Sequence, residues 1–159
     1  MNDTSLEFSV VRSHHAAWLW DFFQALVERG DDKFFHPHPF TVEQAHSISL
    51  HEGRDCYCVA ACTGRVLAYG MLRGWDEGYQ VPSLGIALHP DARGTGLARA
   101  FMLYLHQIAR CQGAPRVRLR VFPQNLRALR LYESLGYVFD SPADEQLVGL
   151  CELRDQNHA

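Results

Sequence analysis

The stretch LHPDARGTGLAR, residues 88–99, decides how this chain folds. It follows an apolar run that begins at Pro82, and its middle holds Gly94 and Gly96. From Leu97 onward, apolar residues recur every three or four positions. This order predicts a strand, a tight turn and an amphipathic helix. Such a turn brings the N–H groups of a helix N-terminus together, which favours a bound phosphate or pyrophosphate.

Two other phosphate-binding motifs are excluded by the residues around this turn. The segment Gly94-x-Gly96-x-x-Arg99 lacks the third glycine of a dinucleotide fingerprint, and no acidic residue follows about 20 positions later. The Gly-Lys-Ser or Gly-Lys-Thr of a P-loop does not follow either. The turn therefore suits the pyrophosphate of another kind of ligand.

Length and composition indicate a single globular domain over residues 1–159. The chain is 47% hydrophobic and 21% charged, as in an average globular domain. Its apolar runs are shorter than the ~20 residues that cross a bilayer, and residues 1–10 do not resemble a signal peptide. The five cysteines form no disulfide framework, so we expect reduced thiols and a cytoplasmic protein with no membrane partner.

Positive charge is concentrated in one part of the chain. Residues 93–130 contain eight arginines and no acidic residue, whereas the whole chain has 15 Lys and Arg, 18 Asp and Glu, and a net charge of −3. The net charge argues against a nucleic-acid partner. A cationic segment in an acidic protein favours a small polyanion such as coenzyme A, although solvated helix faces would give a similar pattern.

Periodicity and turn residues place the remaining elements. Gly30 is expected to end the first helix, and Thr41 and Gln44 form a capping box that begins the second. The expected helices span residues 14–29, 41–50, 97–111 and 125–135. The expected strands span residues 8–11, 56–62, 65–73, 82–88, 116–121, 137–140 and 146–153.

Two motifs resemble a known family. Arg93-x-x-Gly96-x-Ala98 matches the (Gln/Arg)-x-x-Gly-x-(Gly/Ala) motif of the GNAT superfamily of acetyltransferases, and NLRALRLYESLGY, residues 125–137, resembles its downstream signature. The expected order β-α-α-β-β-β-α-β-α-β-β is also that of the GNAT fold. The resemblance covers nearly the whole chain, but its specific motifs lie within residues 82–137. It implies an α+β (α/β) domain with a mixed sheet of six to seven strands, about four helices, and a splay between the strands that bind the cofactor.

The resemblance implies that acetyl-CoA binds around the glycine-rich turn. The backbone N–H of Ile86 would polarise the acetyl carbonyl. Three of these residues have a structural alternative, since Ile86 and Leu88 also suit a core and Asn125 suits a helix N-cap. The residues expected to bind the cofactor are Ile86, Ala87, Leu88, Arg93, Gly94, Thr95, Gly96, Leu97, Ala98, Arg99, Asn125, Ala128 and Tyr132.

The catalytic expectation also follows from the resemblance. Tyr132 matches the family tyrosine that acts as general acid toward the thiolate, and a phenol keeps its proton at neutral pH. The alternative is a core aromatic residue. The glutamate that several family members use as general base is replaced here by Pro82. Asp76, Glu77 and His89 are near in sequence, and none is favoured over the others.

The resemblance also implies that the segment between the first two helices borders the acceptor pocket. The residues expected there are Phe35, His36, Trp75 and Tyr79. Packing of a loop explains these aromatic residues equally well. His36 and His38 are spaced like metal ligands, but no Cys or carboxylate stands at zinc-site spacing beside them, so we expect no metal. The acidic N-terminal half favours a cationic acceptor, and the aromatic loop favours one with a ring.

The leading functional hypothesis is an enzyme that moves the acetyl group of acetyl-CoA directly to a primary amine, through a tetrahedral intermediate. The acceptor would be a small molecule, a protein N-terminus or a lysine. A catalytically weak CoA-binding sensor or regulatory domain is the alternative, and a purely structural domain is disfavoured by the intact glycine turn. The acceptor, the length of the acyl group and a homodimeric state remain open at this point.

Overall fold

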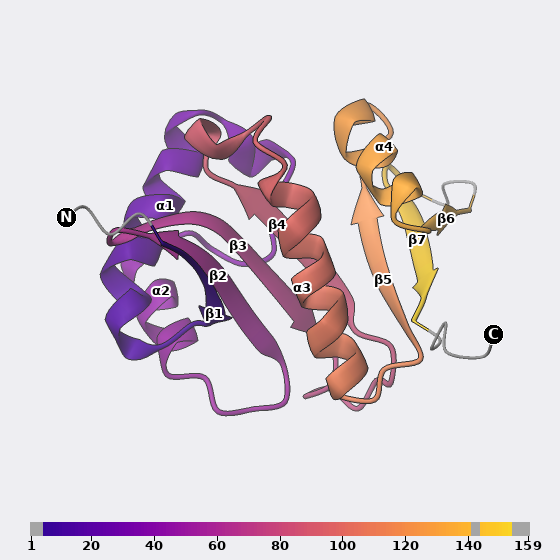
Figure 1. Ribbon diagram of the computed structural model, residues 1–159, viewed down its shortest axis with the longest axis horizontal. Coiled ribbons are helices and arrows are strands. Elements are labelled where there is room, and N and C mark those ends of the chain that lie inside the picture. The colour runs from indigo at the N-terminus through magenta and orange to yellow at the C-terminus, as the bar shows by residue number, and fades with distance from the viewer. Residues whose placement is uncertain (1–4, 141–143, 154–159) are drawn as a thin grey trace.

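Seven strands form one mixed sheet in the order β1-β2-β3-β4-β5-β7-β6 (Figure 1). The computed structural model describes residues 5–140 and 144–153. In chain order, the strands are β1 (Leu6–Val10), β2 (Cys56–Cys62), β3 (Arg65–Arg73), β4 (Ser83–Leu88), β5 (Arg116–Val121), β6 (Val138–Phe139) and β7 (Leu147–Glu152). The fold confirms the expected α+β class, element order and mixed sheet of six to seven strands.

The direction of pairing changes once, near the middle of the sheet. Every neighbouring pair is antiparallel except β4 and β5, which run parallel. These two strands are joined at one residue pair, Ser83 with Arg118, and the N–H of Arg118 donates to the carbonyl of Pro82 at 3.0 Å. Toward their carboxyl ends β4 and β5 separate (Figure 1). This is the splay that the resemblance to the GNAT family implied.

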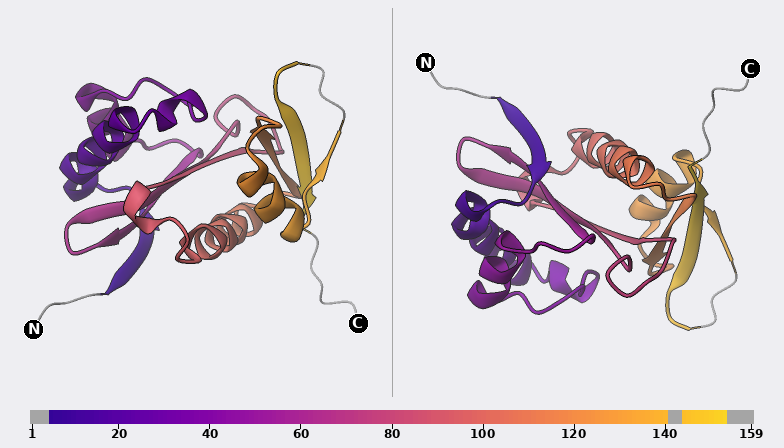
Figure 2. Two further views of the ribbon diagram at one scale, coloured as in Figure 1. Left: turned by 90° about the horizontal axis from the view of Figure 1, so that it is seen from above. Right: turned by 90° about the horizontal axis from the view of Figure 1, so that it is seen from below.

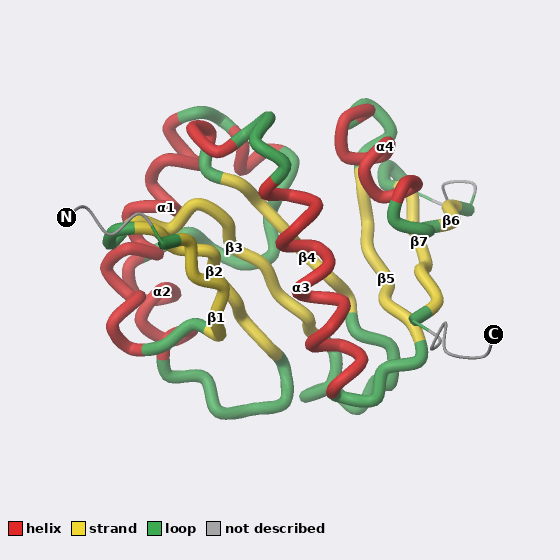
Figure 3. The backbone as a smooth tube through the Cα atoms, viewed as in Figure 1, coloured by secondary structure: helices red, strands yellow, loops and turns green. Residues whose placement is uncertain are grey.

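Four helices cover the two faces of the sheet (Figures 1 and 2). One face carries α1 (Ala16–Glu28) and α2 (Val42–Ser49), and the opposite face carries α3 (Leu97–Cys111) and α4 (Leu126–Ser134). Figure 3 shows the long connection from α1 to α2, which passes beside the carboxyl end of β4. The helices therefore flank the splay from both sides.

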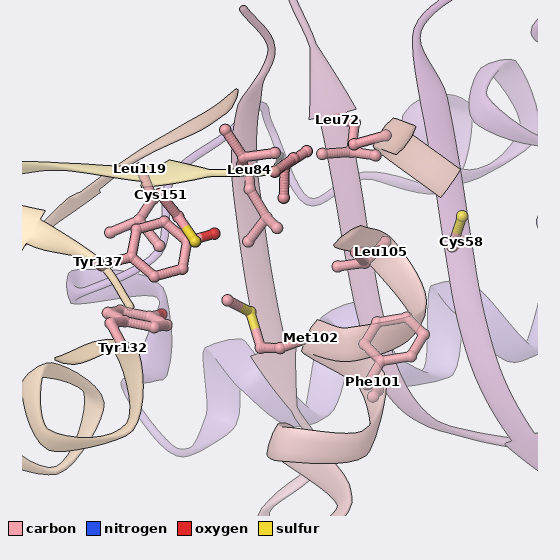
Figure 4. Packing of buried hydrophobic residues seen from close by; sticks show 14 of the residues in the cluster. Cys58, Leu72, Leu84, Phe101, Met102, Leu105, Leu119, Tyr132, Tyr137 and Cys151 are labelled. Atoms are coloured by element: carbon pink, nitrogen blue, oxygen red, sulfur yellow. The ribbon is translucent and has the colours of Figure 1, made fainter. Parts of the chain in front are cut away.

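Each face has its own hydrophobic core. Phe22 and Phe23 of α1 pack with Tyr69 and Met71 of β3 on one side. The core on the other side joins α3, α4 and the inner face of β5, and it includes Phe101 (Figure 4). Alternation along each strand sends neighbouring side chains to opposite cores, which fixes the register of the sheet.

Local signals fix most of the element ends. Gly30 adopts φ of 73°, the left-handed conformation that ends α1, and the Thr41 side chain accepts from the N–H of Gln44 at 3.1 Å at the start of α2. Three short 3₁₀ helices were not expected from the sequence: Ser13–His15, Asp31–Lys33 and Pro90–Ala92. Each is a single turn within a connection, and a single turn is too short to produce a hydrophobic periodicity in the sequence.

Candidate functional site

The splay between β4 and β5 opens into a cavity of about 390 Å³. One wall is β4 and the connection from α1 to α2, and the other is the end of β5 with the start of α4. The residues expected to bind a cofactor that line this cavity are Ile86, Ala87, Leu88, Arg93, Asn125 and Tyr132. The structure thus brings residues 86–93 together with residues 125–132, two segments that are separated by an intervening helix and strand.

Backbone groups of β4 face this cavity. The N–H of His89 donates to Leu67 of β3 at 2.7 Å, while the carbonyl of Pro82 accepts from β5. Because consecutive residues of a strand alternate in direction, the N–H and C=O groups of Ile86 and Leu88 point toward β5. Among the described residues the β4–β5 ladder has ended before this point, so these groups can bind an extended ligand between the strands.

The glycine-rich turn lies at the N-terminus of α3, beside the cavity. Gly94 and Gly96 have φ values of 74° and 84°, which favour glycine, and Gly96 is the N-cap of the helix. The Thr95 hydroxyl donates to the carbonyl of Ala92 at 2.6 Å and holds the turn. A Cβ atom added to Gly96 would meet nothing within 4 Å. The N–H of Leu97 donates to the Thr95 hydroxyl at 3.4 Å, and the N-terminus of α3 borders open space at Gly96, where the helix dipole favours an anion.

Arginine side chains around the turn have distinct roles. Arg93 forms an ion pair with Asp31, and Arg99 donates to the Ser134 hydroxyl at 3.0 Å, outside the cavity. Arg127 was not among the predicted site residues, yet it lines the cavity and its guanidinium lies 3.5 Å from a Cβ built on Gly94. The excess of arginine in residues 93–130 was the only sequence signal for it. Arg127 is the cation best placed for a phosphate at the turn.

Tyr132 of α4 lines the cavity from the side opposite β4. Its ring is almost completely buried and lies 5.8 Å from the ring of Tyr137 (Figure 4). Burial raises the pKa of Tyr132 to about 12, because the phenolate would lose its hydration. Tyr132 therefore carries its proton at neutral pH and can donate it to an anion that forms in the cavity.

Asn125 and Ala128 begin α4. The Asn125 side chain accepts from the N–H of Ala128 at 3.3 Å, so the N-cap role is confirmed. Asn125 also lines the cavity, whereas Ala128 packs against the core. Asn125 therefore caps α4 at the cavity wall, and its role toward a cofactor stays a prediction.

The residues expected at the acceptor pocket separate into two groups. Phe35 and His36 line a hollow of about 300 Å³ that adjoins the cavity at Gly85. Trp75 is buried in the core beneath Arg54, whose guanidinium lies 5.9 Å from its ring, and Tyr79 is 64% exposed on an outer groove. Trp75 and Tyr79 also share a hollow of about 360 Å³ whose lining includes neither Phe35 nor His36.

The three residues considered as general base are also separated. Asp76 accepts from the N–H of Arg54 at 2.6 Å and contacts His51 at 3.1 Å, away from the cavity. His89 accepts from the N–H of Asp91 at 3.1 Å, and burial lowers its pKa. Glu77 lines the outer groove with Tyr79. Of the three, Glu77 is the one found in the lining of this outer groove, beside Arg73 and Ser83.

Other chemistries find little support in the described residues. Within residues 5–140 and 144–153, no group of three or more His, Cys, Asp and Glu could hold a metal ion. No helix in the same ranges is both long and apolar enough to cross a membrane. Burial raises the pKa of the Cys58 thiol to about 12, so this cysteine is protonated and does not act as a nucleophile at neutral pH.

Comparison with known proteins agrees with this geometry. The family model described as "Acetyltransferase (GNAT) family" matches residues 14–137. The "Acetyltransferase SG1711" of Sodalis glossinidius is 31% identical over 109 residues, which cover 69% of this chain and 74% of that protein.

Solved structures of low sequence identity share the fold. The GNAT domain of S. lividans PAT superposes with a TM-score of 0.79 at 14% identity, over 92% of this chain and 90% of that one. The structure of yncA from Salmonella typhimurium, solved with its cofactor acetyl-CoA, has a TM-score of 0.74 at 16% identity and covers 96% of both chains.

Proposed function

Because this chain belongs to the acetyltransferase (GNAT) family, we propose that the cavity between β4 and β5 is its active site. The chain is an acyl-CoA-dependent N-acetyltransferase and uses acetyl-CoA, which supplies an acetyl group activated as a thioester. Proteins of this family act on amine acceptors. The observation that carries the proposal is that the open edge of β4 and the protonated Tyr132 face each other across one cavity.

The residues present fit acetyl-CoA. The carbonyl of Ile86 and the N–H and C=O groups of Leu88 suit the amides of its pantetheine arm, which would lie beside β4 like an additional strand. The free space at Gly96 and the first N–H groups of α3 suit its pyrophosphate, with Arg127 adding positive charge. A side chain in place of Gly96 would occupy this space.

Two groups of the chain act on the reacting thioester in this proposal. The N–H of Ile86 faces the cavity and stabilises the oxyanion that develops on the acetyl oxygen when an amine attacks. The hydroxyl of Tyr132 donates a proton to the departing thiolate, and its raised pKa ensures that the proton is present. Phe34 and Phe35 add aromatic rings to the lining of the same cavity.

The test is release of free thiol from acetyl-CoA in the presence of primary amines, with mass spectrometry to detect the acetylated amine. An N-acetyltransferase releases thiol only when an acceptor is present, and the acceptor gains one acetyl group. Binding of acetyl-CoA without acetylation of any amine would instead support the sensor alternative.

A further inference from the structure

Three polar side chains stand in a row across the centre of the sheet. Arg73 at the end of β3 pairs in register with Ser83 of β4, and Ser83 pairs with Arg118 of β5. The three residues are therefore neighbours across adjacent strands. The two arginines are two strand spacings apart, roughly 10 Å, with a hydroxyl between them.

All three point to the face of the sheet that carries α1 and α2. Val117 and Leu119, which flank Arg118, are buried in the opposite core with α3. Met71, two residues before Arg73, packs in the core with α1. Gly85, two residues after Ser83, would place a Cβ atom 3.2 Å from Phe35 on the same face. Side-chain alternation thus puts the row in the groove beside Phe35.

Of the three arginines of β5, Arg118 differs from the other two in having no ion pair with a described carboxylate. Arg116 pairs with Glu152 at 3.5 Å, and Arg120 pairs with Asp144 at 3.5 Å. Arg118 lies opposite Leu150, and the hydrogen bond found for its side chain is to the Ser83 hydroxyl at 3.5 Å. Within residues 5–140 and 144–153, no carboxylate lies within ion-pair distance of Arg118.

Arg73 has a similar environment. The described residues include no carboxylate within ion-pair distance of it, and its guanidinium interacts with the Tyr57 phenol. Glu77 is the one described carboxylate that lines the groove around Arg73 and Arg118. Two arginines of one site, without carboxylate partners, create a local positive potential that favours an anionic ligand.

The groove leads directly to the proposed reaction centre. Arg73, Ser83 and Arg118 line both the outer groove, of about 970 Å³, and the hollow of about 300 Å³ that contains Phe35 and Gly85. Ser83 precedes Ile86 by three residues, about 10 Å along the strand. A small molecule bound by the arginines can therefore extend its amine toward the acetyl group held at Ile86.

We propose that the amine acceptor carries an anionic oxygen group, a carboxylate or a phosphate, which Arg73, Ser83 and Arg118 bind. This inference rests on the proposed function, since it assigns the acceptor side of the same site. Arginine suits such a group because its planar fork donates two parallel hydrogen bonds. The acceptor is thus zwitterionic, unlike the cationic acceptor that the acidic N-terminal half favoured.

The first experiment compares acceptors that differ only in the acid group. The pairs are L-phenylalanine with phenethylamine and O-phosphoethanolamine with ethanolamine, and spermidine serves as a purely cationic amine. We expect kcat/KM to be at least roughly tenfold higher for the acid-bearing member of a pair, as loss of a charge-assisted hydrogen bond implies. A larger ratio of kcat/KM for the L-phenylalanine pair indicates a carboxylate site, and a larger ratio for the O-phosphoethanolamine pair indicates a phosphate site. Equal or better use of phenethylamine, ethanolamine or spermidine overturns the inference but leaves the acetyltransferase function in place.

The second experiment uses variants of the row. Arg118→Gln and Arg73→Gln should each raise KM for the acid-bearing acceptor roughly tenfold or more, with the KM for acetyl-CoA unchanged. Arg116→Gln is the matched control, because it removes an arginine from the same face of β5 outside the groove. An unchanged KM in both row variants contradicts the inference. If no amine is acetylated by the parent protein, the proposed function itself fails.

Discussion

The guanidinium of Arg93 lies 2.5 Å from the carboxylate of Asp31, although the two residues are 62 positions apart. This ion pair joins the glycine-rich turn to the connection between α1 and α2, and both residues line the cavity. The ion pair therefore holds the glycine-rich turn close to the Phe34–Phe35 segment. In the proposed active site the turn belongs to the cofactor side and Phe35 to the acceptor side, so this ion pair joins the two sides.

Asp31→Asn should raise the KM for the acceptor while changing the free energy of unfolding only slightly. Both side chains are partly exposed, so the free energy of unfolding should change by less than about 1 kcal/mol. Without the ion pair, Phe34 and Phe35 lose their anchor to the turn, and the KM for the acceptor should rise several-fold. Steady-state kinetics and a urea titration check the two effects. A large loss of stability with unchanged KM would contradict this role.

Gly96→Asp should abolish the stabilisation that acetyl-CoA gives to the parent protein. A ligand at 100 times its Kd stabilises the folded state by about 2.7 kcal/mol, which a thermal melt detects. The aspartate would put a side chain and a negative charge into the open space at the N-terminus of α3. Gly113→Asp is the matched control, because Gly113 also has a positive φ, 83°, and open space, but follows the C-terminal end of α3. Equal melting shifts in both variants would place the pyrophosphate elsewhere.

Tyr132→Phe should slow the chemical step without weakening acetyl-CoA binding. The ring still packs in the core, and only the proton for the thiolate is lost. General acid catalysis contributes about 10²–10⁴-fold, so single-turnover acetyl transfer should slow by a factor in that range.

Tyr137→Phe is the control for this variant. The Tyr137 hydroxyl bonds Nε2 of the buried His106 at 2.6 Å, so its loss should destabilise the fold by about 1–3 kcal/mol. Below the unfolding temperature, its turnover should match that of the parent. Equal transfer rates for Tyr132→Phe and the parent would show that Tyr132 is only a core residue.

The free energy of unfolding should fall as the pH is lowered from 7 to 5. Burial lowers the pKa of His15, His38, His89 and His106, in the last case to about 4, from 6.5. Below pH 6.5 the unfolded chain therefore binds protons that the folded chain does not, which favours unfolding. His106 alone should account for about 2 kcal/mol at pH 5. Urea titrations at the two pH values measure the loss, which His106→Gln should reduce. Equal stability at both values would contradict this explanation.

Much of the fold was predictable because its signals are local. Periodicity gave β2, β3, α3 and β5 at the observed bounds, and the motif at residues 88–99 located the turn. These patterns depend on neighbours a few positions apart. The sequence therefore located the glycine-rich turn that lies beside the cavity, and it indicated the family.

The residues of the proposed acceptor site could not be predicted from local sequence patterns. The row of Arg73, Ser83 and Arg118 exists only through the register of three strands, which no local pattern specifies. Trp75 was expected at the pocket, but the turn that follows β3 places it in the core. Arg93 was expected to face only the cofactor, and its distant partner Asp31 could not be inferred from spacing.

The most direct test of the proposed active site is amide hydrogen exchange in β4, measured by NMR with and without acetyl-CoA. The N–H groups of Ile86 and Leu88 point into the splay and should exchange quickly in the free protein and slowly in the complex. The N–H of Ala87 points to β3 and should be protected in both states, which makes it an internal control. Protection of Ile86 and Leu88 only in the complex is the predicted result. Unchanged exchange at both amides, with acetyl-CoA bound at saturation, would show that the cofactor does not lie between β4 and β5.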